Sequence, residues 1–477
     1  MQQVYILGIG GTFMGHLALL ARQLGCQVSG CDANVYSPMK ELLIGQAITF
    51  DEGYDPSNLP GENCTYIIGN ALSRGNAMIE AILNRGYIYT SGPAWLAEHV
   101  LRKRWVVAIA GTHGKTTTTS MVAWILKQRN LKPGYLIGGA AKGFAQAAEL
   151  GEGDFFVIEA DEYDTAFFDK RSKFIHYQPK TLLLNNLEFD HSDIFADLAA
   201  IETTMHHVVR TVPSSGHVVW AAQDQALTRV LARGCWSQQH RLYLGGAEAE
   251  TEADNSQSRS RNWYGRMINS DGSRIMLSHV GESYEIEWNL LGRHNMANAL
   301  AALAVTATLG IVPKDAIDAL KCFPGVTRRM DELFNDAFTV VIDDFAHHPT
   351  AIQTSLQALR ARVQKQRILA IVEPRSNTMA QGSHHDSLQR AVVVADEVCW
   401  LMHDRVRFDP QAWSTATQPH YVFRSGEALL GHILRQRQLE PGQLNILSMS
   451  NGSLDGVLAK LVDALAQNDA IQTPKAL

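Results

Sequence analysis

Residues 106–120, "VVAIAGTHGKTTTTS", constrain the fold more than any other segment. An apolar run leads into a glycine turn, and the turn leads into a segment of helical pattern. A strand, a glycine-rich loop and a helix in this order form a phosphate-binding unit, because backbone N–H groups and the helix N-terminus face the anion. The alternative, a glycine turn with a surface lysine, does not explain this context. The sequence therefore predicts a nucleotide-binding α/β domain.

The loop departs from the usual nucleotide pattern, which reads G-x-x-x-x-G-K-[ST]. Its first glycine would fall on Ile109, and Gly111 stands two positions later, so the loop reads G-x-x-G-K-T. The lysine, Lys115, would bridge the β- and γ-phosphates, and the hydroxyl of Thr116 would face Mg²⁺. Whether the loop is damaged or belongs to another class of ATP user depends on the rest of the chain.

Strand-like and helix-like segments alternate over most of the chain, which favours α/β domains with parallel sheets. Its 477 residues exceed one ordinary core. We predict three domains. They are a Rossmann-like domain at 1–104, a central phosphate-loop domain with extra antiparallel strands at 105–322, and a Rossmann-like α/β domain at 323–477.

Three segments have their own patterns. Residues 263–292 alternate apolar and polar side chains around Asp271-Gly272, which predicts antiparallel hairpins. Residues 246–262 are polar and predict an exposed loop. Residues 468–477 predict a frayed tail.

Composition excludes several classes of partner. With 46% hydrophobic and 19% charged residues, a net charge of -6 and a pI near 6.3, the chain fits a globular protein whose main partner is neither nucleic acid nor an anionic membrane. No apolar run reaches the roughly 18 residues of a membrane span, and the N-terminus lacks a signal peptide's basic region. Six cysteines without a C-x-x-C pair fit reduced thiols. We expect a cytoplasmic protein, monomeric or weakly dimeric, that acts on small molecules.

Two apolar strands after the phosphate loop end in acids. Residues 155–164, "FFVIEADEYD", offer four candidate carboxylates for Mg²⁺: Glu159, Asp161, Glu162 and Asp164. A solvated acidic face would explain part of this set. Residues 182–193, "LLLNNLEFDHSD", bring three more polar side chains to a strand end, where α/β sheets place ligands: Glu188, Asp190 and His191. Because Mg²⁺ prefers oxygen ligands, the spacing leaves open whether the histidine binds metal.

The N-terminal "GIGGTFMG" follows a strand and reads G-x-G-x-x-x-x-G, one residue longer than the dinucleotide fingerprint. Asp32 stands at a strand end downstream. By itself this pattern would indicate a nicotinamide dehydrogenase, but a second nucleotide loop follows in the next domain. Two such domains in series indicate two different nucleotides.

Three further signals lie near the end of the central domain and beyond it. "GRHNMANALAA" places Asn295 and Asn298 on one helix face, where paired amides can read an adenine edge or cap the helix. "TRRMDE" and "VVIDDFAHHP" supply a cation and a strand-end carboxylate, suitable for a phosphate and a ribose hydroxyl.

Together these motifs resemble the Mur ligase family, the ATP-dependent ligases that build peptidoglycan precursors. The family's shortened loop, G-T-[HN]-G-K-[ST]-[ST], is similar to residues 111–117, so the resemblance explains the displaced glycine. The other matching positions follow in the family's order through all three domains. They are Glu159, His191, Asn295, Asn298, Arg329 and Asp344.

The resemblance implies that the N-terminal domain binds a UDP-sugar, the central domain binds ATP and Mg²⁺, and the C-terminal domain completes the site on closure. It implies catalytic roles for Lys115, Glu159 and His191, and Mg²⁺ ligation by Thr116, Glu159 and His191. The implied ATP contacts are Gly111, Thr112, His113, Gly114, Lys115, Thr116, Thr117, Asn295, Asn298, Arg329 and Asp344. The implied UDP-sugar contacts are Gly8, Gly10, Gly11, Thr12, Asp32 and Asn70.

The N-terminal loop resembles that of members that use UDP-N-acetylmuramic acid, a sugar with a free lactoyl carboxylate. Some of these attach L-alanine, and others attach the recycled murein tripeptide L-alanyl-γ-D-glutamyl-meso-diaminopimelate. Residues 159–179 resemble the tripeptide-attaching members. Phe189 and Phe345 stand where the L-alanine-attaching members have a proline and a tyrosine, and 375–379 differ from their H-R-Y-T-R segment. We therefore expect the tripeptide as amine substrate, at a site that includes Phe345, Arg375, Ser376 and Asn377.

Three alternatives stay open. The first is a family member that attaches L-alanine. The second is a nucleotide-driven switch, which would share the phosphate loop but would not need a sugar-nucleotide-type domain. The third is a redox enzyme, which would explain the N-terminal glycines but not the second loop.

Overall fold

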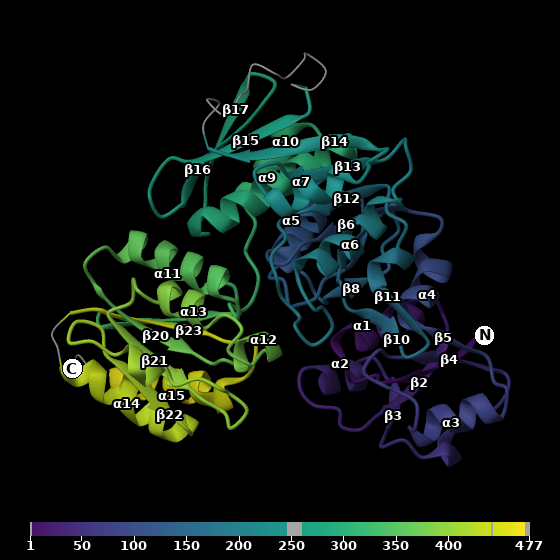
Figure 1. The fold of residues 1–477 in the computed structure, drawn as a ribbon, viewed down its shortest axis with the longest axis horizontal. Coiled ribbons are helices and arrows are strands. Elements are labelled where there is room, and N and C mark those ends of the chain that lie inside the picture. The colour runs from purple at the N-terminus through teal and green to yellow at the C-terminus, as the bar shows by residue number, and fades with distance from the viewer. Residues whose placement is uncertain (1, 246–259, 440–441, 473–477) are drawn as a thin grey trace, which may run out of the picture.

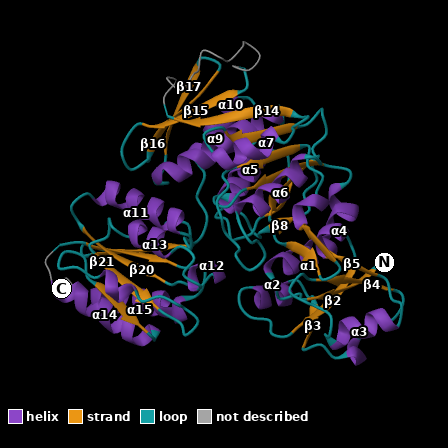
Figure 2. Ribbon diagram, viewed as in Figure 1, coloured by secondary structure: helices purple, strands orange, loops and turns teal. Residues whose placement is uncertain are grey.

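Three β-sheets with flanking helices follow one another along the chain (Figures 1 and 2). The structure is a computed structural model that describes residues 2–245, 260–439 and 442–472. The N-terminal and C-terminal sheets lie at the lower right and lower left of Figure 1, and the central sheet lies above and between them. The predicted α/β class, with two Rossmann-like units around a central one, is confirmed.

The N-terminal sheet is parallel, with the order β3-β2-β1-β4-β5. The order reverses between β1 and β4, so the turn after β1 opens into the crevice where such sheets bind ligands. Its strands are β1 (Gln3–Leu7), β2 (Gln27–Asp32), β3 (Thr49–Glu52), β4 (Cys64–Ile68) and β5 (Tyr89–Ser91). Its helices are α1 (Thr12–Gln23), α2 (Met39–Gly45), α3 (Ala77–Asn84) and α4 (Gly92–Leu96).

The central sheet has the order β17-β16-β15-β14-β13-β12-β6-β9-β7-β8. The hairpins predicted around Asp271-Gly272 are confirmed, because β15, β16 and β17 pair antiparallel at one edge. The exposed loop predicted over 246–262 falls mostly on 246–259, outside the described residues. The strands are β6 (Trp105–Ala110), β7 (Gly134–Leu136), β8 (Ala148–Glu149), β9 (Phe155–Ala160), β12 (Thr181–Leu184), β13 (His217–Ala221), β14 (Gln238–Leu244), β15 (Asn262–Met267), β16 (Arg274–His279) and β17 (Glu282–Glu287).

Helices cover this sheet, and a small hairpin lies beside it. The helices are α5 (Lys115–Gln128), α6 (Leu198–Val209), α7 (Gln225–Ala232), α9 (Gly292–Thr308) and α10 (Pro313–Lys321). The hairpin pairs β10 (Asp164–Ala166) with β11 (Asp169–Ser172). Because α5 packs along α9, the phosphate loop at the start of α5 lies beside the asparagines of α9.

The C-terminal sheet has the order β18-β19-β23-β20-β21-β22 and is parallel except for β18. The tail predicted over 468–477 is wrong for 468–472, where α15 continues through Gln472 because its earlier turns pack on the core through Leu461 and Leu465. Residues 473–477 lie outside the described residues. The strands are β18 (Asp331–Asn335), β19 (Thr339–Asp344), β20 (Arg367–Val372), β21 (Glu397–Leu401), β22 (His420–Phe423) and β23 (Leu444–Met449). The helices are α11 (Pro349–Val363), α12 (Asn377–Ala380), α13 (His385–Ala391), α14 (Gly426–Leu439) and α15 (Val457–Gln472).

The three sheets are not joined equally. One continuous apolar cluster runs from Ile6 and Leu17 of the N-terminal part to Ile158 and Leu184 of the central sheet. The buried members of the C-terminal clusters all lie between residues 340 and 465. The buried members of the C-terminal clusters therefore belong to that part alone, whereas the N-terminal and central parts have one cluster in common beside clusters of their own. In the ranges that the structure describes, no helix has both the length and the apolarity of a membrane span.

A glycine in β2 tests the tight packing of the N-terminal sheet. A Cβ at Gly30 would lie 2.3 Å from the carbonyl oxygen of Ile6, so Gly30→Ala must push β1 and β2 apart. We expect the free energy of unfolding to fall by about 1–3 kcal/mol, measured by urea titration. Gly45→Ala is the control, because a Cβ there meets open space at the end of α2. Equal stability of the two variants would contradict this packing.

Candidate active site

A cavity of about 910 Å³ opens where the three sheets meet. Such a volume suits a nucleotide-sized ligand. Most of the predicted site residues line it: Gly8, Gly11, Thr12, Asp32, Asn70, Thr112, His113, Gly114, Lys115, Thr116, Thr117, Glu159, His191, Asn295, Asn298, Arg329, Asp344 and Phe345. Five others lie outside its lining: Gly10, Gly111, Arg375, Ser376 and Asn377.

The phosphate loop joins β6 to α5 and depends on two glycines with positive φ. Gly111 has φ +136° and Gly114 has φ +80°. A Cβ at Gly114 would lie 2.4 Å from Oδ1 of Asn298. The side chain of Asn186 accepts the backbone N–H of His113 at 2.7 Å, so the strand-end loop after β12 holds the phosphate loop in place.

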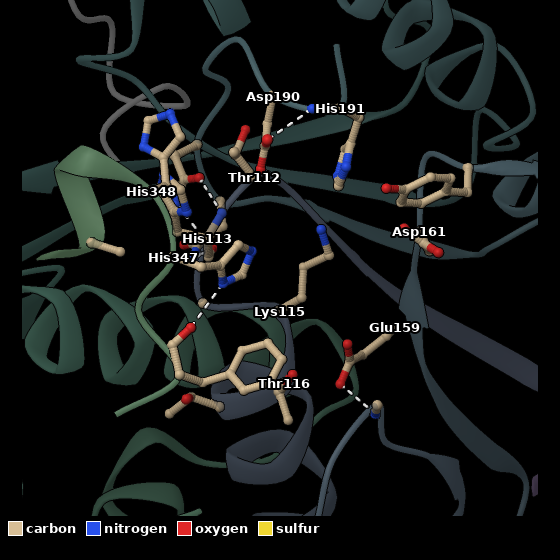
Figure 3. Close-up of a pocket in the computed structure, with 18 of the residues that line it drawn as sticks. Thr112, His113, Lys115, Thr116, Glu159, Asp161, Asp190, His191, His347 and His348 are labelled. Atoms are coloured by element: carbon tan, nitrogen blue, oxygen red, sulfur yellow. Dashed lines mark hydrogen bonds between the residues drawn. The ribbon is translucent and has the colours of Figure 1, made fainter. Parts of the chain in front are cut away.

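A buried carboxylate links the loop lysine to the candidate metal histidine. Lys115 Nζ donates to the carbonyl of Gly111 at 2.8 Å and to Glu162 Oε2 at 3.2 Å. Glu162 Oε1 lies 3.0 Å from Nε2 of His191. Figure 3 shows Lys115 pointing into the space between His191 and Glu159. Three separate segments therefore converge on one charge network.

Contacts with carboxylates shift the pKa values of both basic side chains in this network upward. Burial lowers the pKa of Lys115, but the nearby carboxylates of Glu162, Asp161 and Glu159 outweigh burial and raise it above its ordinary value. Burial likewise lowers the pKa of His191, and contact with Glu162 outweighs it and raises this pKa. A charged lysine here is suited to a polyphosphate.

Glu159 ends β9 and faces the cavity beside Thr116. Its Oε1 accepts the backbone N–H of Gly138 at 2.5 Å, and burial raises the pKa of its carboxyl group. A desolvated carboxylate next to a hydroxyl, with Lys115 nearby, provides oxygen ligands of the kind Mg²⁺ prefers.

The other acids of 155–164 have different surroundings. Asp161 lies 3.1 Å from Nζ of Lys173, and Lys173 is only 10% exposed. Asp164 pairs with Lys170 at 2.6 Å, and the lysine of this pair is 70% exposed. Asp164 therefore fits a solvated ion pair and not a metal ligand.

The two asparagines of α9 share one face, as predicted, but their amides bond differently. Asn298 Oδ1 accepts from Thr118 Oγ1 and from Asn185 Nδ2, each at 3.2 Å. Asn295 Nδ2 donates to the carbonyl of Leu291 at 2.8 Å. Asn298 thus braces the phosphate loop, and Asn295 stabilises the first turn of α9. Recognition of adenine by this pair stays a prediction.

The C-terminal sheet contributes a cation and a carboxylate. The guanidinium of Arg329 lies 4.9 Å from the ring centroid of Phe345. Asp344 ends β19, and Ser355 Oγ donates to its Oδ2 at 2.6 Å. Burial raises the pKa of Asp344 to about 6. Arg329 adds positive charge near Glu159, at the face where the C-terminal sheet meets the phosphate loop.

The N-terminal glycine loop is held by Asp32. The Asp32 carboxylate accepts three hydrogen bonds, from N–H of Gly10 at 2.9 Å, N–H of Ala33 at 2.7 Å and the hydroxyl of Tyr54 at 3.1 Å. Gly8, with φ +82°, makes the turn. Asp32 therefore fixes the loop geometry, and its oxygens are already engaged within the chain.

The structure does not bring the predicted peptide residues 375–377 into the cavity. Arg375 is 44% exposed, and its guanidinium lies 3.5 Å from Glu373. Ser376 Oγ accepts the N–H of Met379 and caps α12. The next residue, Thr378, also lies in α12, and its hydroxyl donates to Asp190 Oδ1 at 3.0 Å. Helix α12 therefore contacts the loop that carries His191.

Sequence patterns did not single out three residues of the cavity and its charge network. Glu162 was one acid among four in its run. Lys173 belonged to no motif, yet its ammonium packs 5.6 Å from the ring of Phe13 in the N-terminal part. His348 was only one of two adjacent histidines, and the structure places it beside Glu188.

Comparison with known proteins gives three matches along the chain. Residues 3–104 match the Mur ligase family, catalytic domain; residues 109–306 match the Mur ligase middle domain; residues 328–448 match the Mur ligase, glutamate ligase domain.

Individual relatives are similar over nearly the whole chain. The UDP-N-acetylmuramate–L-alanyl-gamma-D-glutamyl-meso-2,6-diaminoheptandioate ligase of Escherichia coli is 47% identical over 98% of both chains. The crystal structure of a murein peptide ligase from Psychrobacter arcticus is 39% identical, with a TM-score of 0.72 over 98% of this chain and 99% of that one. A UDP-N-acetylmuramate–L-alanine ligase of Desulfosudis oleivorans is 30% identical over 83% of this chain and 82% of its own.

The resemblance predicted from the motifs is therefore confirmed over the length of the chain, and the protein belongs to the Mur ligase family.

Proposed function

We propose that this protein is an ATP-dependent ligase that joins the lactoyl carboxylate of UDP-N-acetylmuramic acid to the amine of L-alanyl-γ-D-glutamyl-meso-diaminopimelate. The observation that carries the proposal is its 47% identity, over 98% of both chains, to a ligase named for this substrate pair. The L-alanine ligase noted above is less similar and matches a smaller share of the chain. The cavity at the junction of the three sheets has room for converging substrates.

A carboxylate is a poor electrophile, because its delocalised charge repels nucleophiles. In the proposed reaction a lactoyl oxygen attacks the γ-phosphorus of ATP, ADP leaves, and an acyl phosphate forms. The peptide amine then attacks the acyl carbon, the C–O bond to phosphate breaks, and the amine proton passes to solvent. The products are the amide, ADP and phosphate. No covalent bond to the enzyme is required, so the chain's part is positioning and electrostatics.

The first step brings two anions together, and fixed positive charge must offset their repulsion. Lys115 supplies such a charge from the phosphate loop, and its contact with Glu162 aims the ammonium into the cavity. Arg329 supplies a second fixed positive charge, from the C-terminal sheet. Because these cations come from different sheets, the site is complete only when the C-terminal part lies against the central one.

Mg²⁺ fits the donor set on the central sheet. Thr116 and Glu159 offer oxygen ligands at the phosphate loop, and burial makes an unneutralised Glu159 carboxylate costly. His191 would complete the set, and its contact with Glu162 is a carboxylate–histidine arrangement that orients such a ligand. The bound ion would draw negative charge from the phosphate oxygens.

The sugar nucleotide would occupy the crevice of the N-terminal sheet. Its proposed contacts are Gly8, Gly10, Gly11, Thr12, Asp32 and Asn70. Since Asp32 already accepts three hydrogen bonds, we assign it to shaping the loop around the diphosphate. The remaining ATP contacts would come from 111–117, from the α9 asparagines and from Asp344.

The cellular setting follows from the chemistry. Both ATP and a UDP-sugar are cytoplasmic metabolites in the proposed scheme, and we place the enzyme there, acting as a monomer or weak dimer. Its product would feed peptidoglycan synthesis from recycled wall peptides, and so support cell-wall growth, cell shape and division.

Substitution of Lys115 tests whether the loop at 111–117 binds the phosphates of ATP. We expect Lys115→Ala to keep the fold and to lower turnover by about 10²–10³-fold or more, because γ-phosphate charge is no longer offset. Lys127→Ala, on the exposed side of the same helix, is the control and should stay near wild type. The measurement is phosphate release with both co-substrates present. Near-normal turnover of Lys115→Ala would show that the loop assignment is wrong.

Removal of the proposed metal ligands should change the Mg²⁺ requirement. We expect Glu159→Gln and His191→Ala to raise the Mg²⁺ concentration for half-maximal rate by about tenfold or more, with UDP-sugar affinity nearly unchanged in calorimetry. Asp164→Asn, from the same acidic run but in a surface ion pair, should behave as wild type. Equal losses of sugar affinity in the first two variants would instead assign these residues to structure or sugar binding.

Arg375 tests the choice of amine substrate. A tripeptide carries carboxylates far from its reacting amine, and an arginine can bind one of them bidentately. Its position beside α12, which contacts the His191 loop, suits this role. We expect Arg375→Ala to raise the KM for tripeptide about tenfold or more while acyl phosphate, trapped with hydroxylamine, still forms.

The control is Arg424→Ala, at the far edge of the same sheet. For the unaltered protein, L-alanine should be a poor substrate beside the tripeptide. Efficient ligation of L-alanine, together with normal use of tripeptide by Arg375→Ala, would favour the L-alanine ligase. Phosphate release that needs neither UDP-N-acetylmuramic acid nor amine would favour a nucleotide-driven switch.

A further inference from the structure

Three side chains that the proposed chemistry does not use as metal ligands meet at one edge of the cavity. They are His113 of the phosphate loop, Glu188 of the loop after β12, and His348 of the loop between β19 and α11. One ligand atom from each lies within 4.8 Å of the others. The cluster joins the central and C-terminal sheets, and all three residues line the cavity.

The distances match a metal site better than a hydrogen-bonded cluster. Glu188 Oε2 lies 3.4 Å from Nε2 of His113 and 3.4 Å from Nδ1 of His348. Both separations are longer than an ordinary N–H···O bond of about 2.7–3.2 Å. A tetrahedral ion with ligand bonds of about 2.0–2.1 Å places neighbouring ligand atoms roughly 3.3–3.4 Å apart. The two separations from Glu188 Oε2 therefore have the spacing of such an ion's ligands, and the ligand atoms of all three residues lie within 4.8 Å of one another.

The carboxylate is held in place by a further contact. Thr350 Oγ1, on the first turn of α11, donates to Glu188 Oε2 at 2.7 Å. Hydrogen bonds of this kind orient ligands and tune a metal site.

The ligand types select the metal. Two imidazoles and one carboxylate suit Zn²⁺ and its first-row neighbours, whereas Mg²⁺ takes oxygen ligands in octahedral geometry. The proposed Mg²⁺ ligands on β9 and after β12 are a separate set, so both ions could be held together.

We propose that His113, Glu188 and His348 form a second metal site that binds Zn²⁺ or a similar first-row transition-metal ion. A bound ion would tie the phosphate loop to the C-terminal sheet through these three side chains. This inference does not depend on the identity of the sugar or the amine.

Binding of Co²⁺ tests the proposal, because the intense visible bands of Co²⁺ report four-coordination. The full-length protein is titrated with CoCl₂ in buffer containing MgCl₂ and no nucleotide. We expect one tight site with the intense visible bands of four-coordination, no thiolate charge-transfer band, and displacement by Zn²⁺. His113→Asn and Glu188→Gln should each weaken Co²⁺ binding about tenfold or more. Asparagine is chosen for position 113 because the family's loop has either histidine or asparagine there. Unfolding midpoints measured in the presence of a chelator establish that each variant is folded.

Two controls separate this site from others. His347→Gln alters a neighbouring cavity histidine whose Nδ1 faces the carbonyl of Phe345 at 2.8 Å, and it should bind Co²⁺ as wild type does. His432→Gln alters a second three-ligand cluster among the described residues, Glu397–Cys399–His432, and should also have no effect. A thiolate charge-transfer band, loss of binding in His432→Gln, or unchanged binding in folded His113→Asn and Glu188→Gln would each overturn the proposal.

Discussion

The site depends on one buried carboxylate that contacts two basic side chains. Glu162 is 4% exposed, and its two oxygens contact Lys115 and His191. A buried charge without a partner is costly, so these three side chains hold one another in place. Because they come from α5, the end of β9 and the loop after β12, this contact also fixes three elements of the central sheet relative to each other. The phosphate loop, the acidic strand end and the histidine loop therefore form one rigid unit.

The sheets around this unit are coupled to it in different ways. The N-terminal part shares an apolar cluster with the central sheet, so the sugar crevice and the phosphate loop keep a fixed relation. The C-terminal part has its own core, and its contacts with the centre include polar ones, such as Thr350 with Glu188 and Lys142 with Asp331. Polar contacts exchange readily with water, which fits a reaction in which the C-terminal part completes the charge environment and later releases product.

Much of the fold was predictable because it follows local rules. Apolar strands running into glycine turns placed the phosphate loop and the N-terminal loop, and alternation around Asp271-Gly272 placed the hairpins. A site residue could be predicted where the backbone conformation requires one residue type, as at Gly114 with its positive φ. The role of a side chain could not be predicted where it depends on whether that side chain is buried. Glu162 and Asp164 look alike in sequence, yet Glu162 is buried between Lys115 and His191, and Asp164 is paired at the surface. The cluster of His113, Glu188 and His348 needs two sheets to meet, which no local pattern encodes.

In the proposed reaction, ATP activates the lactoyl carboxylate of the sugar nucleotide for amide formation. A complete reaction with ATP, tripeptide and UDP-N-acetylmuramic acid labelled with ¹⁸O in that carboxylate tests this activation. We expect one amide for each phosphate released, with one ¹⁸O atom from the carboxylate in each phosphate, because the acyl C–O bond breaks. Phosphate released without the label, or without matching amide, would contradict it.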